Sequence, residues 1–363
     1  MNTDRSTREA GIDLFIEAAG LCCAVGYHLD AAVCALRANM DHFQESGFYS
    51  LSSDPIVAAM LPDDIHGQER LEQWVLYAVR DCARRMAQPL SLVDARRTAL
   101  IVIGPDNSRA HADASYYLEV VLGAMKKVFA GELDTSDEQR SLHEDATVLL
   151  GGRTGLAAAL VRAKNMLAER PIEQVLVIGV DSYLNAADIN GYLKEERLFV
   201  RGNSDGFIPG EAAAALVLRP APSDQAGLHI KGVGIAHEAG RHDGSVPSRS
   251  QGLTHAIRSA CEQAGIAPTE VNFRISDQNG EQFFSRDATN AITRVMMGGS
   301  KVPHLTLADK IGEVGGAAGP AMLAWLARDM SHKAFSPGQL GLAHMANDDG
   351  TRCAVVLQQQ GKQ

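Results

Sequence analysis

The sequence lacks any uninterrupted apolar run near the ~18 residues that cross a membrane. Its first residues, MNTDRSTREAGID, contain no apolar segment of signal-peptide length. Basic residues are not in excess, since 34 lysines and arginines stand against 44 aspartates and glutamates, for a net charge of −10. Nucleic acids and anionic membranes both require a basic face. We therefore expect a cytoplasmic protein that binds neither nucleic acid nor membrane.

Metal-binding spacings are absent as well. The twelve histidines show neither H-x-x-x-H nor HE-x-x-H, and the six cysteines are scattered along the chain. Cys22 and Cys23 are adjacent and cannot easily form a disulfide with each other. We predict buried free thiols in a reducing compartment, and neither a bound metal nor a cofactor.

The sequence does contain an alternation of strand and helix patterns. Short β-branched-rich apolar runs predict fully buried strands at Ala99–Ile103, Val175–Ile178, Ala213–Leu218 and Cys353–Leu357. Helical periodicity predicts helices at Asp30–Met40, Gly67–Met86, Ala110–Phe129, Gly155–Ala168, Gly252–Gly265, Arg286–Met297 and Gly316–Met330. This alternation indicates a layered α/β fold.

A short linker divides the chain into two halves. RPAPSDQAG, at 219–227, has two prolines and small polar residues, and a new strand is predicted at Leu228–Val233. Both halves open with strand and helix patterns and close with a buried strand, AAALVL in the first and CAVVL in the second. We predict two similar α/β halves, at 13–220 and 228–358.

Several motifs along the chain resemble the β-ketoacyl synthase branch of the thiolase-like superfamily. VLVIGVDSYLN and the following DGFIPGE, residues 205–211, are similar to that family's Val-Asp-Ser strand and its DGF-x-x-GE segment. GLCCAVGYHLDAAVCALRAN resembles its first strand and helix, and IGEVGGAAG at 311–319 resembles its GH-x-x-GAAG segment. These matches occur in the family's order over residues 15–357. The resemblance implies a thiolase-like fold with two similar α/β halves in a five-layered α-β-α-β-α architecture.

The family's catalytic cysteine is not matched here. Ketosynthases transfer an acyl group to a cysteine at a helix N-terminus, where the helix dipole favours the thiolate. When the glycine of the family's T-A-C-S-S-G pattern is placed at Gly155, the nucleophile position falls at Gly152, or at Arg153 after a one-residue slip. Because there is no cysteine between Cys82 and Cys261, the resemblance implies a degenerate nucleophile turn.

The two histidines of the family are not matched either. By the same resemblance they fall at Asp277, in ISDQNGE, and at Glu313, between Gly312 and Gly316. Lys310 lies near the family's lysine but at a different spacing, and the entrance loop falls at Met345–Gly350 without its phenylalanine-glycine pattern. Two carboxylates would put negative charge where condensation develops it, so we expect no ketosynthase activity.

The degenerate positions leave alternatives open. In one alternative, Arg153 bridges Asp277 and Glu313 and seals the former pocket. In the other, Arg153 points to solvent and the two acids have no contact with it. Thr154 would be a hydroxyl nucleophile, or else a cap of the following helix. Asp277–Glu281 is interpreted as a turn rather than a calcium loop, because no acidic residue follows at the required spacing. The mixed charge run from Lys194 to Arg201 predicts a solvated face.

Three functions remain as hypotheses. The first is a non-catalytic scaffold or adaptor that binds a protein partner and forms a homodimer through the strand near His143–Leu150, as the family does. Degenerate members include chain-length factors, which pair with an active synthase. GYHLDAAVCALRANMDHFQESGF and ISDQNGE resemble members associated with bacterial type VI secretion, which implies an effector or its chaperone as partner. The other hypotheses are an acyltransferase that uses Thr154 and a binder of acyl chains or CoA-like ligands.

Overall fold

Ten strands form a single hydrogen-bonded order, β10-β9-β11-β12-β8-β1-β7-β6-β4-β5. The computed structural model describes residues 11–130, 146–222 and 225–361. The first half supplies β1 (Leu14–Cys23), β4 (Thr98–Ile103), β5 (Thr147–Leu149), β6 (Gln174–Ser182) and β7 (Glu211–Pro220). The second half supplies β8 (Gly227–His237), β9 (Phe273–Ser276), β10 (His304–Thr306), β11 (Leu340–Ala346) and β12 (Thr351–Gln360).

The two halves repeat the same strand topology. In the first half, β1 and β6 pair antiparallel with β7, while β6, β4 and β5 run parallel. In the second half, β8 and β11 pair antiparallel with β12, while β11, β9 and β10 run parallel. A short antiparallel contact, Leu14 opposite Ile230 and Phe15 opposite His229, joins β1 to β8. The predicted internal repeat is therefore present in the strand order.

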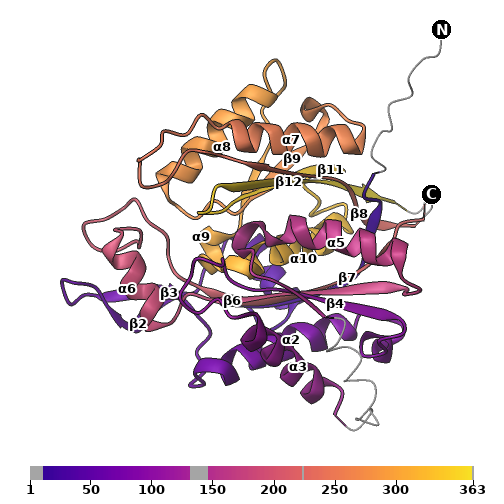
Figure 1. Cartoon of the computed structure of the whole chain (residues 1–363), viewed down its shortest axis with the longest axis horizontal. Coiled ribbons are helices and arrows are strands. Elements are labelled where there is room, and N and C mark those ends of the chain that lie inside the picture. Colours follow the sequence, from indigo (N-terminus) through magenta and orange to yellow (C-terminus); the bar gives the residue numbers. More distant parts are fainter. Residues whose placement is uncertain (1–10, 131–145, 223–224, 362–363) are drawn as a thin grey trace.

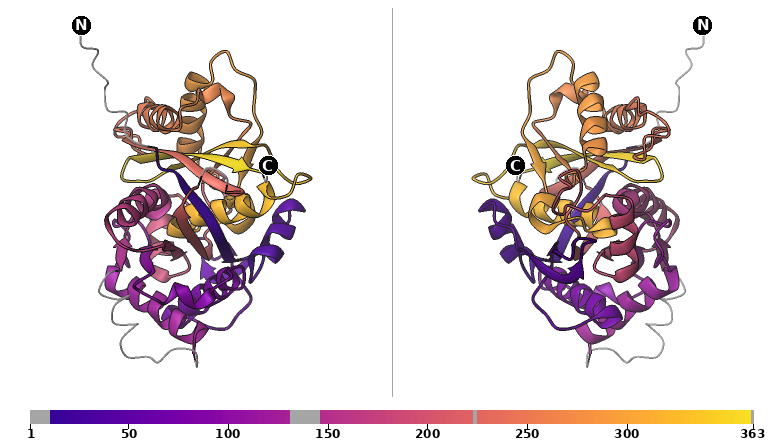
Figure 2. Two further views of the ribbon diagram at one scale, coloured as in Figure 1. Left: turned by 90° about the vertical axis from the view of Figure 1, so that its right-hand side faces the viewer. Right: turned by 90° about the vertical axis from the view of Figure 1, so that its left-hand side faces the viewer.

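Helices cover both faces of each half-sheet. α2 (Gly67–Ala83) and α3 (Ala114–Val128) lie outside the first half, and α7 (Gln251–Ala264) and α8 (Gln282–Val295) lie outside the second. α5 (Gly155–Glu169) and α10 (Ala318–Met330) lie between the two half-sheets. Figure 1 shows the resulting five layers and Figure 2 shows them from the sides, so the predicted architecture is confirmed.

Smaller elements lie at the ends of these layers. α1 (Leu29–Arg37) follows β1, and a separate hairpin is formed by β2 (Phe43–Tyr49) and β3 (Pro55–Ala59). α6 (Ala186–Lys194) follows β6, and the one-turn α9 (Ala308–Ile311) precedes α10. The helices and strands predicted from periodicity all exist, with ends shifted by a few residues.

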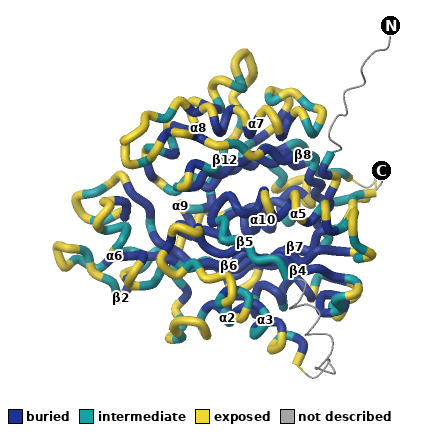
Figure 3. The backbone as a smooth tube through the Cα atoms, viewed as in Figure 1, coloured by how far each residue is buried: buried dark blue, intermediate teal, exposed yellow. Residues whose placement is uncertain are grey.

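The core depends on small residues in the middle layer. Every residue from Glu211 to Leu218 in β7 is buried, because helices pack on both faces of this strand. In α10, a Cβ added at Gly319 would lie 2.6 Å from Leu156 Cβ of α5, so glycine allows the two central helices to approach closely. Figure 3 shows α10 and most of the two half-sheets as buried, while α5 has exposed positions on one side and β5 is half-buried.

The two central helices begin in the same way. A short 3-10 turn, η2 (Gly152–Thr154), leads into α5, and η4 (Gly315–Ala317) leads into α10. Gly152 and Gly315 both have φ of +48°, a left-handed conformation that favours glycine. The two turns contact each other between the half-sheets. The fold therefore brings Gly152 and the segment after Gly312 to one place.

The helices and the cysteines of the described residues bear on two of the expectations from the sequence. None of the helices in the described ranges is long and apolar enough to cross a membrane. Five of the cysteines are buried, as predicted, but Cys34 is exposed. The prediction was wrong for Cys34 because this residue lies on the outer face of α1, away from the buried positions Leu29, Ala32, Val33 and Leu36.

Candidate functional site: a buried arginine cluster

The turn at Gly152 has no room for a side chain. Gly152 lies between β5 and α5, and its N–H donates to Gly104 O at 3.2 Å. A Cβ added here would lie 2.9 Å from Asn347 Oδ1 and 3.1 Å from both Cβ and N of Asp106. The positive φ adds backbone strain for any L-residue. A cysteine at this position would therefore force the neighbouring chain to move.

Arg153 is buried in the space beside this turn, with 4% of its surface exposed. Its Nη2 donates to Asp348 Oδ1 at 3.3 Å, its Nη1 lies 3.5 Å from Glu313 Oε2, and its Nε lies 3.8 Å from Asp277 Oδ2. The guanidinium also packs 4.3 Å from the centroid of the Phe284 ring. Arg153 does not point to solvent, and the expected contact with both acids is present.

The two acids at the expected histidine positions are fixed by neighbouring groups. Glu313 Oε1 accepts the Gly315 N–H at 2.9 Å, and its Oε2 accepts from Asn279 Nδ2 at 2.8 Å. Asp277, directly after β9, accepts the Ala346 N–H at 2.9 Å. Both carboxylates face the guanidinium of Arg153 from the second half of the chain. Gly152, Arg153, Asp277 and Glu313, the positions singled out in the sequence, therefore lie together.

A second arginine belongs to the same cluster. Arg197 Nε donates to Glu281 Oε1 at 2.7 Å, and its Nη2 donates to Glu281 Oε2 at 3.1 Å. The same guanidinium donates to Asp348, from Nη1 to Oδ2 at 2.8 Å and from Nη2 to Oδ1 at 3.0 Å. The prediction of a solvated face was wrong for Arg197, which is buried, because carboxylates distant in sequence surround it. Lys194 and Arg201 of the same run are exposed, as predicted.

The hairpin between β11 and β12 closes the cluster. Asn347 Nδ2 donates to Gly151 O at 3.2 Å and to a carboxylate oxygen of Asp106. The next residue, Asp348, contacts both arginines. This hairpin is the segment expected to form an entrance loop. In the structure its polar side chains bind the turn at Gly152 and both guanidinium groups.

The cluster holds more acid than base. Among the described residues, Asp277, Glu281, Glu313 and Asp348 form their ion pairs with Arg153 and Arg197, so four carboxylates share two paired cations. Burial raises the pKa of Asp277, and burial raises that of Glu313 although Arg153 opposes the rise. Burial opposes ionisation of Asp348 as well, yet Arg197 and Arg153 lower the pKa of this residue to about 2.

Arg153 remains charged in this environment. Burial alone would lower the pKa of its guanidinium, but Glu313, Asp277 and Asp348 raise it further than burial lowers it. Its Nη1 has no hydrogen-bond acceptor among the described residues, although Glu313 Oε2 lies 3.5 Å away. Charge attraction rather than hydrogen-bond geometry therefore holds Arg153 against Glu313.

A second buried ion cluster lies near the turn at Gly152. Arg109 Nη1 donates to both oxygens of Asp181 at 2.8 Å, and its Nη2 donates to Asp188 Oδ2 at 2.5 Å. Asp181 Oδ2 also accepts the Gly316 N–H at 3.0 Å, and the Arg109 guanidinium lies 3.9 Å from the Tyr183 ring centroid. The residues that follow VLVIGV in the sequence are therefore part of a filled, ionic interior.

Two predicted site residues lie apart from the arginine cluster. Thr154 stands at the N-cap position of α5, as one of the two alternatives expected, but its hydroxyl donates back to Gly151 O at 3.3 Å and makes no capping hydrogen bond. Its backbone already has helical angles, and the hydroxyl cannot reach the free N–H groups of α5. Lys310 is buried, and its amine pairs with Asp309 Oδ2 at 2.5 Å rather than with the cluster.

The segment Asp277–Glu281 is an irregular loop between β9 and α8. Asp277 faces Arg153, while Glu281 faces Arg197, so its acids are engaged by arginines. Within the described ranges, the structure brings no three histidine, cysteine, aspartate or glutamate residues into an arrangement suited to a metal ion.

Comparison with known proteins identifies the fold. Residues 228–340 match the family model of the β-ketoacyl synthase C-terminal domain. The ketosynthase ApeO in complex with its chain length factor ApeC, from Xenorhabdus doucetiae, superposes with a TM-score of 0.73 at 16% identity, covering 99% of this chain and 100% of that one. The fold is that of a ketosynthase. A β-ketoacyl synthase from Burkholderia phymatum gives 0.71 at 15% identity, covering 96% of this ketosynthase-like chain and 100% of that one.

One curated relative is similar in sequence. Polyketide synthase ThaG of Burkholderia thailandensis is 29% identical over 223 residues, which cover 53% of this chain. The match spans 4% of that synthase's length. The ketosynthase-like chain described here therefore corresponds to a small part of that much longer protein.

Proposed function

We propose that this chain is a non-catalytic, ketosynthase-like protein that acts by binding a protein partner. The observation that carries this proposal is the position of Arg153. Its guanidinium is buried and faces Asp277, Glu313 and Asp348, in the space beside the turn where a nucleophile would lie. A site filled by its own ion pairs has no free group to receive an acyl chain.

The chemistry of the surrounding groups supports the same proposal. Acyl transfer requires a nucleophile with a base within hydrogen-bond reach, and donors directed at the developing oxyanion. At Gly152 there is no side chain, and Asp277 and Glu313 are acceptors that face a cation. The hydroxyl of Thr154 donates to a backbone carbonyl. These contacts argue against the acyltransferase alternative.

The free edge of β5 supports a strand-pairing interface. β5 is the last strand of the sheet order and pairs only with β4 within the described part of the chain. Leu149 O accepts the Gly104 N–H, so Leu149 faces β4. Because successive residues of a strand present their polar groups to opposite sides, Val148 presents its N–H and C=O to the free edge. The expected dimer strand, His143–Leu150, includes residues 143–145, which lie outside the described residues.

A ketosynthase is the partner that these observations favour. Solved structures of the same fold include the complex of the ketosynthase ApeO with its chain length factor ApeC, and the PfaC ketosynthase–chain length factor, with a TM-score of 0.70. In such a pair, one subunit of this fold binds another. The proposed role is therefore that of a chain-length-factor-like subunit, and a type VI secretion effector or its chaperone is the competing partner class.

Two measurements test this proposal. The first is intact mass after incubation with acetyl-, malonyl- and octanoyl-CoA, with Thr154→Ala as the matched control. We expect no covalent adduct on either protein. An adduct on the wild-type chain that is lost in Thr154→Ala would establish an acyltransferase instead.

The second measurement identifies the partner by copurification. The genes of the two proteins are then coexpressed, and the complex is purified. We expect a complex of fixed stoichiometry with a ketosynthase that keeps its own cysteine and histidines. Recovery of a secretion effector or its chaperone would replace the chain-length role with an adaptor role. A homodimer that retains no other protein under both conditions would contradict the proposal.

A further inference from the structure

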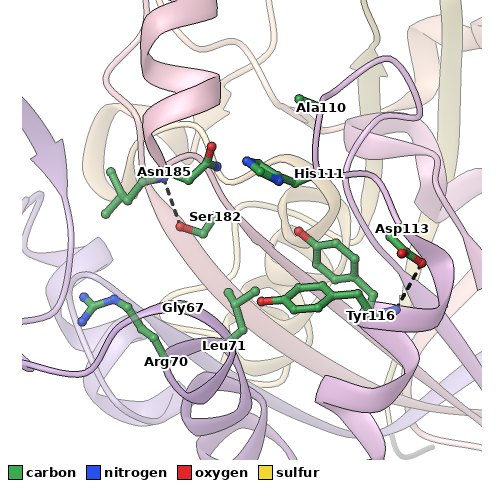
Figure 4. A pocket seen from close by; sticks show the side chains of 11 residues that line it. Gly67, Arg70, Leu71, Ala110, His111, Asp113, Tyr116, Ser182 and Asn185 are labelled. Atoms are coloured by element: carbon green, nitrogen blue, oxygen red, sulfur yellow. Dashed lines mark hydrogen bonds between the residues drawn. The ribbon is translucent and has the colours of Figure 1, made fainter.

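A pocket of 470 Å³ lies outside the arginine cluster. It is bounded by the first turn of α2, the first turns of α3 and the connection between β6 and α6, and Figure 4 shows its side chains. Its volume falls in the range of about 300–1,000 Å³ that is typical of small-molecule sites. β5, where we propose that the partner binds, contributes no residue to this pocket.

The pocket is separated from the nucleophile turn by ionic groups. Ala110, Ser182 and Asn185 line the pocket, while their neighbours Arg109, Asp181 and Asp188 form the buried ion cluster described above. A molecule in the pocket would meet this cluster before it could reach Arg153. The pocket is therefore suited to binding rather than to delivering a substrate to the turn at Gly152.

Tyr117 provides a hydrogen-bonding group directed into this space. Its side chain lines the pocket with only 3% of its surface exposed, and no described residue forms a hydrogen bond with its hydroxyl. The hydroxyl oxygen itself is not fully buried, so it meets water in the pocket, and a ligand with an acceptor atom would replace that water as its hydrogen-bond partner. Burial raises the pKa of this phenol, so it stays protonated and able to donate.

Aromatic and aliphatic surfaces surround this hydroxyl. Tyr116 lines the same pocket and packs edge-on against Tyr117, with ring centroids 5.3 Å apart and planes at 84°. Leu71 and Leu184 contribute apolar surface from the α2 side and the β6–α6 side. In Figure 4 the Tyr116 ring faces Leu71 across the space. A planar ring would gain both apolar burial and favourable aromatic contacts here.

The charged groups at the pocket are already engaged. Arg70 Nε donates to both oxygens of Glu211 at 2.9 Å, its Nη1 donates to Asp63 O at 2.6 Å, and its Nη2 donates to Leu61 O at 2.9 Å. Asp113 accepts the N–H groups of Ser115 and Tyr116 at the start of α3. A phosphate or carboxylate would therefore find no free guanidinium, which disfavours CoA-like ligands and favours a neutral one.

We propose that this pocket binds a neutral, planar aromatic molecule with a carbonyl oxygen that accepts a hydrogen bond from the Tyr117 hydroxyl. The ring lies against Tyr116 and between Leu71 and Leu184. The ligand is bound without covalent chemistry, because the buried Arg109 cluster closes the way to the nucleophile turn.

Fluorescence titration with 6-propionyl-2-dimethylaminonaphthalene tests this inference. The probe is neutral, has two fused rings and one ketone, and reports both apolar surroundings and hydrogen bonding to its carbonyl. We expect saturable binding to the full-length chain with a blue-shifted emission. Tyr117→Phe removes only the hydroxyl, so affinity should fall about three- to tenfold and the emission should shift further to the blue.

Two more variants separate this site from non-specific binding. Leu184→Trp fills the pocket from a half-buried position and should abolish saturable binding, provided that its circular dichroism and melting temperature match the wild type. Tyr49→Phe is the matched control at an exposed tyrosine far along the chain on β2, and it should change nothing. Unchanged affinity and emission in Tyr117→Phe, or no saturation by the wild type up to millimolar probe, would overturn the inference.

Discussion

Arg197 holds Glu281 with two hydrogen bonds, from Nε to Oε1 at 2.7 Å and from Nη2 to Oε2 at 3.1 Å. The two residues are 84 positions apart and belong to different halves of the chain. Such paired N–H···O contacts combine charge with fixed geometry. Because the same guanidinium also binds Asp348, it connects three loops that approach the turn at Gly152. The cluster therefore holds the two halves of the chain together through hydrogen-bonded ion pairs.

Removing the central cation should destabilise the chain strongly. Arg153→Met leaves Asp277 and Glu313 buried without their counter-charge, and we expect a loss of about 3–5 kcal/mol in the free energy of unfolding at pH 7. Burial already raises the pKa of both acids, and loss of the arginine raises it further. The deficit should thus grow as pH rises from about 4 through those pKa values, and shrink on acidification. Urea denaturation at several pH values measures this.

The control for this prediction is Arg201→Ala. Arg201 is exposed and belongs to the same half of the chain, so its loss should leave the urea midpoint unchanged at every pH. If Arg153→Met were as stable as the wild type at pH 7, the ion pairs with Asp277 and Glu313 would not contribute to folding.

Asp348→Asn should lose its deficit on acidification as well, but within a lower and narrower range of pH. Arg197 and Arg153 hold the pKa of Asp348 at about 2, below the value of about 3.9 in an unfolded chain. The stability that it contributes is therefore complete above about pH 3.9, and is lost as pH falls towards 2. We expect Asp348→Asn to be less stable by roughly 2 kcal/mol at neutral pH, with the difference vanishing near pH 2. Asp64→Asn, at an exposed site, is the control.

Even a methyl side chain at position 152 should destabilise the protein. Gly152→Ala places a methyl group 2.9 Å from Asn347 Oδ1 at a positive φ, and we expect a loss of about 1–3 kcal/mol. Gly191→Ala is the matched control, because Gly191 lies within α6 with open space around its Cα and should become more stable by about 0.5–1 kcal/mol. Equal melting temperatures for the two variants would show that the turn adapts freely.

Val148→Pro tests the free edge of β5. Proline removes the N–H that we assign to the open side, while edge strands tolerate its fixed φ. We expect the wild-type chain to elute as a dimer in light-scattering chromatography, and Val148→Pro to elute as a monomer with unchanged circular dichroism. Val148→Ala retains the N–H and should remain a dimer. Dissociation of both variants to the same degree would instead point to the valine side chain.

The fold could be predicted because it depends on local apolar patterns and on motifs that occur in a fixed order along the chain. Buried runs such as Ala213–Leu218 are apolar throughout, which only a strand covered on both faces requires. Gly155 and the IGEVGGAAG segment fixed the register of the two central helices. From that register, Gly152, Arg153, Asp277 and Glu313 were expected at one place, and the structure brings them together.

The rest of the cluster depends on contacts that no local pattern encodes. Arg197 stands in a run of mixed charge that resembles any solvated helix end, and its partner Asp348 lies 151 residues away. Asn347 and Asp348 stood out only through a missing phenylalanine-glycine pattern, which says nothing about what replaces it. These residues are buried because of contacts between distant parts of the chain. The sequence feature that could have suggested a buried arginine is the surplus of acids near the expected histidine positions.

The turn at Gly152 and the charge of Arg153 make substitutions at this site depend on one another. A cysteine placed at 152 would collide with Asn347 and Asp106, and a protonated imidazole placed at 277 or 313 would meet the positive charge of Arg153. Each of these single substitutions therefore meets a residue that suits the present arrangement. The positions are epistatic, so a different set of side chains fits here only when several of them change together.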